Sequence, residues 1–389
     1  MAMLSITLIF KEGNNERKIL IVGAGIAGLS AAISLAKADF DVTVVERSTS
    51  LADGASITLV NRGPDALRDL GVLAQCLAES FHGKGRSLYS DVYDAAGNKI
   101  PVPSLPVRDD DLPSYVLIYR PILARILTEK AQSLGSQVCL GKGVEKLTDN
   151  GNDFSVLYMD GQQDVFDLVV GADGTSSQTP KALFGDSITS TYSSNMSLRW
   201  VKKGLPEGPG GFYSTDESHA VVVHELHDDY VYIATGMDME NRRVSASEGV
   251  SLLRQALGRW DAPYIRTLLE NVADDDTVIV RPYCYHLLPE LWHKGRIALI
   301  GDAVHTMSAH IASGGVMSME DGLVLGDELA KGGSLDERLT RFAHRRYPRA
   351  FIAVDSCRQV LELQVRDKAH PSELSKVREK AFAALLKPY

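Results

Sequence analysis

The clearest pattern of apolar and polar positions lies near the N-terminus. An apolar run at residues 19–22 leads into the glycine-containing turn 23–28, which reads GAGIAG and opens an alanine-rich segment at 29–38. A second apolar run at 42–45 then ends in the acid Glu46. Short apolar runs on either side of a helix-length segment predict a strand, a helix and a second strand. The pattern therefore indicates a βαβ unit of the kind that binds a dinucleotide.

Each glycine of this turn has a physical role in such a unit. Gly23 permits the tight turn, Gly25 lets the backbone approach a pyrophosphate, and Gly28 lets the helix pack closely on the strand. The N-terminus of the helix offers free N–H groups and a positive dipole end to the phosphates. Glu46, about 20 residues beyond the glycines, suits a ribose hydroxyl. This stretch alone does not distinguish FAD from NAD.

Composition and charge narrow the class of protein. The 389 residues are 44% hydrophobic and 23% charged, which suits a globular chain with room for two domains. The net charge of −9 argues against a nucleic-acid partner. The four cysteines are scattered without CxxC or zinc-type spacing, so we expect reduced thiols, no metal site and a cytoplasmic location. Residues 1–17 lack the features of a signal peptide, and no apolar run approaches the about 20 residues of a transmembrane helix, so we expect no membrane insertion.

Three separated phrases carry a resemblance to a known family. GAGIAG with VVER lies near the N-terminus, DLVVGADGTSS lies near residue 170, and RIALIGDAVHTM followed by SMEDGLVLGDELA lies near residue 300. In this order they resemble the class A FAD-dependent monooxygenases, the aromatic-hydroxylase-like flavoproteins. The resemblance extends over about residues 18–360 and includes compact members such as the salicylate- or urate-hydroxylase-like and the tetracycline-inactivating monooxygenases.

The resemblance implies an α/β fold with a Rossmann-like FAD-binding domain, an inserted antiparallel-sheet substrate domain and a long C-terminal helix. The sequence pattern agrees, because helical periodicity fades after about residue 189 and strand-like alternation replaces it. The expected boundaries are 18–188 for the first part of the FAD-binding domain, 189–280 for the substrate domain, 281–333 for the second part of the FAD-binding domain, and 334–389 for a C-terminal helical segment with a short tail after Pro371.

Carried over by position, the family motifs assign residues to FAD, with NAD(P)H as a transient reductant. The residues implied are Gly23, Gly25, Ala27 and Gly28 at the pyrophosphate, Glu46 and Arg47 at the adenosine ribose, Arg120 near the phosphate and ribityl chain, Asp173 and Gly174 in a motif linked to both FAD and NAD(P)H, Gly301 and Asp302 at the ribityl hydroxyls, and Gly314 and Gly315 facing the isoalloxazine ring. The flavin supplies the chemistry in this class, so no catalytic side chain beyond it is expected.

The chain departs from the family pattern beside the expected flavin ring. Four residues beyond His305 the family carries a proline, followed by a Gly-Gln-Gly triplet, whereas this chain has Ala309 and then Ala312-Ser313-Gly314. Gly314 and Gly315 still allow a close backbone approach to the ring. The departures bear on oxygen activation and on movement of the flavin, and they leave the FAD-binding motifs intact.

Substrate contacts are only weakly encoded. The antiparallel sheet at about 196–237 is expected to form one wall of the substrate site, with either the set that begins at His219 and Val221 or the set Ala220, Val222 and His224 facing the substrate. The candidates for polar contact are Arg199, Tyr213, His224 and His310.

The leading functional hypothesis is an NAD(P)H-dependent FAD monooxygenase. The resemblance implies that it hydroxylates an aromatic or polycyclic small molecule, with a tetracycline-type antibiotic among the options, through a flavin C4a-hydroperoxide. Two alternatives stay open: an FAD-dependent oxidase or reductase that inserts no oxygen, and an FAD-containing protein that only binds a small molecule. The sequence does not predict the oligomeric state.

Overall fold

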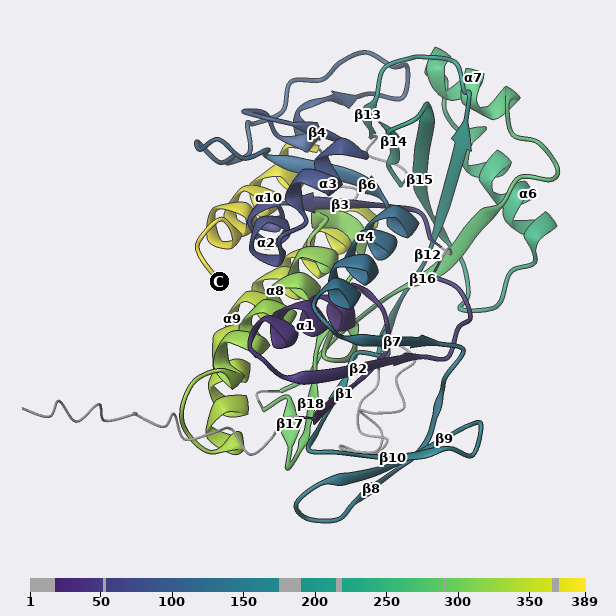
Figure 1. Ribbon diagram of the computed structural model, residues 1–389. Coiled ribbons are helices and arrows are strands. Elements are labelled where there is room, and N and C mark those ends of the chain that lie inside the picture. Colours follow the sequence, from purple (N-terminus) through teal and green to yellow (C-terminus); the bar gives the residue numbers. More distant parts are fainter. Residues whose placement is uncertain (1–17, 52–53, 175–189, 215–218, 290, 366–370) are drawn as a thin grey trace, which may run out of the picture.

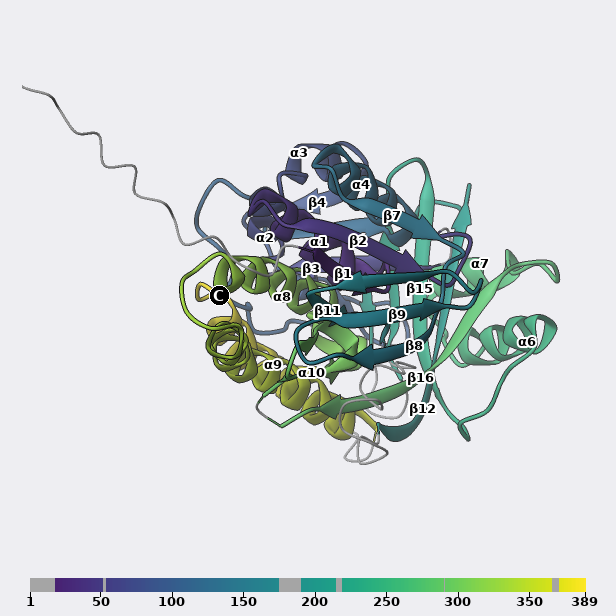
Figure 2. The ribbon, with the colours of Figure 1, turned by 60° about the horizontal axis from the view of Figure 1, so that its bottom comes forward.

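The computed structural model describes residues 18–51, 54–174, 190–214, 219–289, 291–365 and 371–389. Figures 1 and 2 show two large sheets, with helices α1, α4 and α8 beside the first and helices α6 and α7 outside the second. Helix α9 packs against α8, and α10 packs on α9 at the C-terminal end of the chain. The α/β fold expected from the sequence is confirmed.

The first sheet has six strands in the order β17-β18-β11-β1-β2-β7, all parallel except the edge strand β17. Its strands are β1 (Lys18–Val22), β2 (Asp41–Glu46), β7 (Gln137–Leu140), β11 (Leu168–Gly171), β17 (His293–Lys294) and β18 (Ile297–Leu299). The central strands are apolar almost throughout, because both faces of a parallel sheet are covered. The predicted βαβ unit is present as β1, α1 (Ile26–Lys37) and β2.

Helix α1 packs against α4 (Arg120–Ser133) and along α8 (Gly314–Leu329). The contact with α8 is close because glycines of α8 face it: a Cβ at Gly322 would lie 2.4 Å from the backbone nitrogen of Ala31. Helix α8 begins at Gly314. Its N-terminal end therefore reaches the loop where the flavin ring is expected.

The second sheet has seven strands in the order β19-β16-β12-β15-β14-β13-β5, and all its pairs are antiparallel except β13 with β5. Its strands are β5 (Val92–Tyr93), β12 (Thr191–Lys203), β13 (Gly211–Tyr213), β14 (Val221–Glu225), β15 (Tyr230–Asp238), β16 (Val278–Leu287) and β19 (His305–Thr306). Helices α6 (Ala246–Leu257) and α7 (Pro263–Glu270) share an apolar core with one face of this sheet. The opposite face is free to line a site.

Two smaller sheets complete the described part. One has the order β3-β6-β4 and is accompanied by two short helices; the other is a β10-β9-β8 meander. Their elements are β3 (Ser56–Val60), α2 (Gly63–Leu70), α3 (Leu73–Ala78), β4 (Ser80–Gly83), β6 (Tyr115–Tyr119), β8 (Val144–Asp149), β9 (Phe154–Tyr158) and β10 (Gln163–Phe166).

One sequence expectation about secondary structure needs correction. The tail expected after Pro371 is a helix, α10 (Pro371–Leu385), which packs on α9 (Leu335–Val365). Asp167 separates β10 from β11, and its carboxylate accepts a hydrogen bond from the N–H of Lys18 at 2.8 Å. Beyond β5, the segment that follows forms one isolated bridge, Tyr93 with Lys99.

The expected division into domains stays a prediction. Strand β16 runs without interruption across the boundary placed at residue 280, and it pairs with both β12 and β19. In the described ranges, no helix combines the length and the apolar character needed to cross a membrane.

Candidate active site

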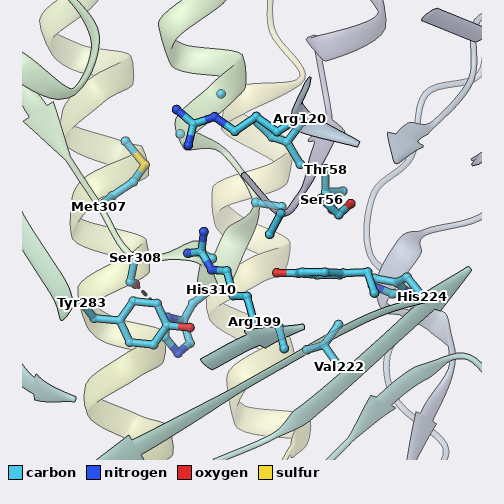
Figure 3. A pocket seen from close by; sticks show the side chains of 18 of the residues that line it. Ser56, Thr58, Arg120, Arg199, Val222, His224, Tyr283, Met307, Ser308 and His310 are labelled. Atoms are coloured by element: carbon cyan, nitrogen blue, oxygen red, sulfur yellow. Dashed lines mark hydrogen bonds between the residues drawn. The ribbon is translucent and has the colours of Figure 1, made fainter. Parts of the chain in front are cut away.

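A pocket lies between the N-terminus of α1, the open face of the seven-stranded sheet and the loop 307–315. Its cavity volume is about 340 Å³. Residues from α1, β3, α4, β12, β14, β15, β16, α8, α9 and α10 line it. In Figure 3, Arg120 lies at one end, Tyr283 and His310 lie together toward the other, and Arg199 extends into the space between them.

The α1 end of the pocket has the features of a phosphate site. Gly25 precedes the helix in an extended conformation, no side chain caps the helix, and no acid occupies its first turn. A Cβ built on Gly25 would meet no atom within 4 Å, so the space in front of these free N–H groups is open. A Cβ on Gly28 would instead lie 2.0 Å from the carbonyl oxygen of Gly23, which explains the glycine there. Free helix N–H groups facing open space favour an anion.

Glu46 holds the shape of this turn. One of its carboxylate oxygens accepts a hydrogen bond from the N–H of Ala24 at 3.1 Å, and the other accepts one from the N–H of Ser48 at 2.9 Å. Of the residues assigned to FAD from the sequence, the pocket wall includes Gly25, Ala27, Arg120, Gly174, Asp302, Gly314 and Gly315, whereas Gly23, Gly28, Glu46, Arg47, Asp173 and Gly301 lie outside it. The expected contact of Glu46 and exposed Arg47 with a ribose stays a prediction.

Arg120 and Asp302 place opposite charges on the pocket wall. Arg120 is the first residue of α4, and Asp302 lies in the 3₁₀ turn η4 (Gly301–Ala303) that follows β18. Among the described residues, nothing forms a hydrogen bond with the Asp302 carboxylate. Desolvation raises the pKa of Asp302, and His305 and Arg120 act in the opposite direction. A carboxylate that faces a cavity without a donor is available to a hydroxyl group of a ligand.

The loop 307–315 carries the departures from the family pattern. It contains the 3₁₀ turn η5 (Ala309–Ile311), and Ala312 follows with φ 50° and ψ 32°, in the left-handed region. An alanine there costs about 1 kcal/mol, which the glycine of the family pattern would avoid. The hydroxyl of Ser313 donates to the carbonyl of Ile311 at 3.0 Å, so this side chain points back into the loop.

A buried carboxylate positions the turn that carries Asp302. The Oδ2 atom of Asp321, on α8, accepts a hydrogen bond from the N–H of Gly301 at 2.8 Å and lies 2.6 Å from Nε2 of His305. Both Asp321 and His305 are fully buried. Burial alone would lower the pKa of His305, but the charge of Asp321 raises it. His305 is therefore a structural partner of Asp321, and the described geometry places it outside the pocket wall.

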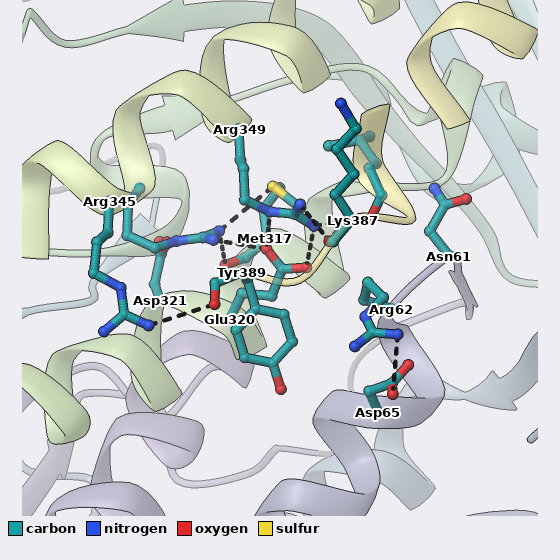
Figure 4. A network of polar contacts seen from close by, with 12 residues as sticks. Asn61, Arg62, Asp65, Met317, Glu320, Asp321, Arg345, Arg349, Lys387 and Tyr389 are labelled. Atoms are coloured by element: carbon teal, nitrogen blue, oxygen red, sulfur yellow. Dashed lines mark hydrogen bonds and ion pairs between the residues drawn. The ribbon is translucent and has the colours of Figure 1, made fainter. Parts of the chain in front are cut away.

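An ion-pair network connects this carboxylate to the C-terminal helices (Figure 4). Arg346 of α9 donates to Asp321 and to its neighbour Glu320, both at 2.7 Å. Arg349 donates to Glu320 at 2.8 Å and also to the carbonyl oxygens of Leu385 and Lys387, at 3.0 and 2.8 Å. Arg346 and both carboxylates are fully buried. Through Asp321, the arginines of α9 therefore help to hold the η4 turn in position.

Three of the four substrate candidates line the pocket: Arg199, His224 and His310. Tyr213 does not, and this expectation is corrected. Its ring lies in the apolar core beneath α6 and α7, and its hydroxyl donates to the carbonyl of Pro209 at 2.7 Å. The neighbouring residue Phe212 lines the pocket instead, because successive side chains of a strand point to opposite faces.

On β14 the structure selects one of the two predicted sets. Val222 and His224 face the pocket together with Ala220, whereas Val221 and Val223 belong to the core on the other face. His219, which precedes the strand, also lines the pocket, and its Nε2 atom lies 2.8 Å from a carboxylate oxygen of Asp238.

The charge states at the substrate end follow from burial. Desolvation lowers the pKa of His224 to about 4 and that of His310 to about 3, so both rings are neutral at pH 7. Desolvation raises the pKa of Tyr283 to about 12. For Arg199, burial alone would lower the pKa, but Tyr232, Tyr283 and Asp302 raise it, so the guanidinium stays charged.

Sequence reasoning missed several pocket residues. Tyr89 precedes β5, Tyr283 lies on β16, and Arg378 lies on α10, and all three line the pocket. Alternation along β16 could have singled out Tyr283 once its sheet was known. No local signal marks Tyr89 or Arg378. The two residues are distant in the sequence and meet only because α10 packs beside the 3₁₀ turn Leu88–Ser90 that contains Tyr89.

The fold and pocket together define a flavoprotein with a Rossmann-like dinucleotide site that opens onto an antiparallel-sheet wall. The chain matches the FAD binding domain family over residues 16–225 and 285–356, and it belongs to that family. It is an FAD-dependent monooxygenase of the aromatic-hydroxylase type.

One curated relative and two solved structures are similar to this chain over most of its length. The 6-hydroxynicotinate 3-monooxygenase of Pseudomonas fluorescens is 28% identical over 343 residues, which cover 83% of this chain and 85% of that protein. Among solved structures, Klebsiella pneumoniae HpxO complexed with FAD and uric acid has a TM-score of 0.74 at 19% identity, covering 95% of this chain and 92% of that one. The tetracycline destructase Tet(55) has a TM-score of 0.74 at 21% identity, with 96% of each chain covered.

The described residues fit FAD. The open space at Gly25 and the uncapped α1 suit the pyrophosphate, and Arg120 adds a positive charge on the same wall. The Asp302 carboxylate can accept hydrogen bonds from the ribityl hydroxyls. Gly314 and Gly315 present backbone without side chains beside the expected ring position.

Asp302→Asn is expected to weaken FAD binding about tenfold, because a hydrogen bond to a charged group is replaced by one to a neutral group. The dissociation constant is measured by quenching of flavin fluorescence on titration of the apoprotein. The fold should be unaffected, since removing the charge also removes its desolvation cost. Asp274→Asn, at an exposed position outside the pocket, serves as the control. Unchanged FAD affinity in Asp302→Asn would refute the assignment of this carboxylate.

Proposed function

We propose that the protein uses NAD(P)H and O₂ to hydroxylate an aromatic or polycyclic small molecule. The observation that carries the proposal is the shape of the pocket: its FAD end continues past the loop 307–315 to a wall of apolar and aromatic side chains. Phe212, Val222, Tyr232 and Tyr283 belong to this wall. Bound FAD would supply the redox and oxygen chemistry.

The side chains at this end can bind and orient a hydroxylated ring. Neutral His224 and His310 can each accept a hydrogen bond from a substrate hydroxyl, since burial keeps them unprotonated. The ring of Tyr283 packs against that of His310 with centroids 5.2 Å apart, which fixes both orientations. A wall of this kind excludes water from the reacting ring, which favours oxygen transfer to the substrate over loss of peroxide.

The test is a substrate screen with the purified FAD-loaded protein. NADH or NADPH oxidation is followed with 6-hydroxynicotinate, urate, simple phenols and tetracycline, and products are analysed by mass spectrometry together with hydrogen peroxide. We expect at least one of these compounds to stimulate oxidation and to gain the mass of one oxygen atom. Tetracycline belongs in the screen because Tet(55) shares the fold, although the likeness extends no further than the fold.

A second candidate function is an FAD-dependent oxidase or reductase. It is favoured by Ala309 and Ser313, which replace the family's proline and glutamine beside the expected ring. Hydrogen peroxide formed in step with NAD(P)H consumption, without an oxygenated product, would support this function over hydroxylation. Ligand binding with no stimulation of turnover would instead indicate an FAD-containing binding protein.

A further inference from the structure

Arg378 is a positively charged pocket residue that is not among the residues assigned to FAD. It comes from α10 and reaches the substrate end of the pocket. Its Nε atom donates to the backbone carbonyl of His310 at 3.3 Å, and its guanidinium carbon lies 4.8 Å from the centre of the Tyr89 ring. Among the described residues, no carboxylate forms an ion pair with it. Within the described ranges, its terminal nitrogens have no hydrogen-bond acceptor, so their donors can serve a ligand.

The surroundings hold this guanidinium in place without neutralising it. Tyr89 packs against Phe382, one turn further along α10, with ring centroids 5.7 Å apart, so the helix is anchored beside the pocket. Desolvation lowers the pKa of Arg378, which shows that its environment disfavours the charge. A carbonyl oxygen and an aromatic face compensate a partly buried cation only in part. A planar guanidinium with free donors is suited to bidentate recognition of a carboxylate.

The charges that line the pocket also favour an anionic ligand. Three arginines line it, Arg120, Arg199 and Arg378, and Asp302 is the single carboxylate among the described lining residues. Arg120 belongs to the FAD end, where the cofactor brings its own negative charges. Arg199 contacts Tyr283, and Arg378 contacts His310. Because the rings of Tyr283 and His310 pack together, the two remaining cations flank one region of the wall.

We infer that the substrate is an aromatic acid and that Arg378 recognises its carboxylate. The inference rests on the proposed function for the identity of the ring chemistry, but the binding of the acid group does not depend on turnover. Arg378 is then a specificity-determining residue. It lies on α10, the helix at the position where the sequence pattern predicted a short tail.

The test uses the oxidised FAD-loaded protein at neutral pH and matched pairs of probes: salicylate with salicylamide, and hydroxynaphthoate with its amide. Binding is read from the change in the flavin absorbance spectrum, without NAD(P)H. The unaltered protein is expected to bind an acid at least about 10-fold more tightly than its amide. Arg378→Met keeps the apolar stem and should remove this preference, Arg378→Lys should retain part of it, and Lys380→Met, at an exposed position of the same helix, should leave it intact.

A second readout separates recognition from a structural role. If Arg378 serves a ligand, Arg378→Met without ligand should melt at the same temperature as the parent or higher, because a poorly compensated cation has been removed. Amides bound as tightly as acids, failure of both acids to bind, an acid preference that survives Arg378→Met, or a large loss of thermal stability would each overturn the inference. If the acids bind through Arg378 but are not oxygenated, the proposed monooxygenation fails and the recognition stands.

Discussion

Gly25→Val is expected to give a folded protein that has lost FAD. A side chain at this position meets no protein atom within 4 Å, and the backbone of Gly25 is extended (φ −75°, ψ −177°), which valine adopts readily. The added methyl groups would instead occupy the space in front of α1 where the pyrophosphate belongs. Steric overlap of this kind costs about 1–3 kcal/mol or more, so FAD affinity should fall about 10- to 100-fold or further.

The measurement is the flavin content of the purified protein and the FAD affinity of its apo form. Gly332→Val is the matched control, since a Cβ there also meets no atom within 4 Å and the position lies outside the pocket. The control should bind FAD like the parent, and both variants should unfold cooperatively near the parent temperature. A yellow Gly25→Val protein with normal affinity would show that the pyrophosphate does not approach this glycine.

Arg346→Met is expected to lower the free energy of unfolding by about 3 kcal/mol, because it leaves two fully buried carboxylates with incomplete partners. Glu320 would keep Arg349, and Asp321 would keep His305 and the Gly301 N–H. Urea unfolding of the apoprotein measures the change. FAD affinity should fall as well, since Asp321 positions the turn that carries Asp302.

Arg358→Met is the control for this prediction because it lies on the same helix and also pairs with two carboxylates, those of Asp355 and Glu362. Its side chain is 39% exposed, so the loss should not exceed about 1 kcal/mol. Equal losses in the two variants would mean that the buried network contributes no more than a surface ion pair.

The sequence predicted the elements whose signals are local. The turn from Gly23 to Gly28 lies between two apolar runs, and the structure confirms the strand, the helix and the parallel strand around it. The switch to an antiparallel sheet was also visible, because period-two alternation replaces helical spacing. These patterns depend on which face of an element is buried, and the order of apolar and polar residues within the element determines that face.

What the sequence could not predict depends on register and on long-range packing. Tyr213 was misplaced because a shift of one residue exchanges the two faces of a strand, and only its pairing with Val221 fixes which face meets α6 and α7. Arg378 was missed because its neighbours Tyr89 and His310 come from distant parts of the chain. The pocket is assembled from such contacts, so the residues that carry a recognisable motif, such as Arg120 and Asp302, were predicted, whereas Phe212, Tyr283 and Arg378 were not.

Strand β16 has a mechanical consequence. It carries Tyr283 on the substrate wall and pairs with β12 along that wall. At its other end it pairs with β19, whose last residue, Thr306, directly precedes the loop that begins at Met307. A hinge motion that separated the wall from the loop would have to break this ladder. The ladder therefore couples the position of Tyr283 on the wall to the position of the loop 307–315, so the two sides of the substrate end move together.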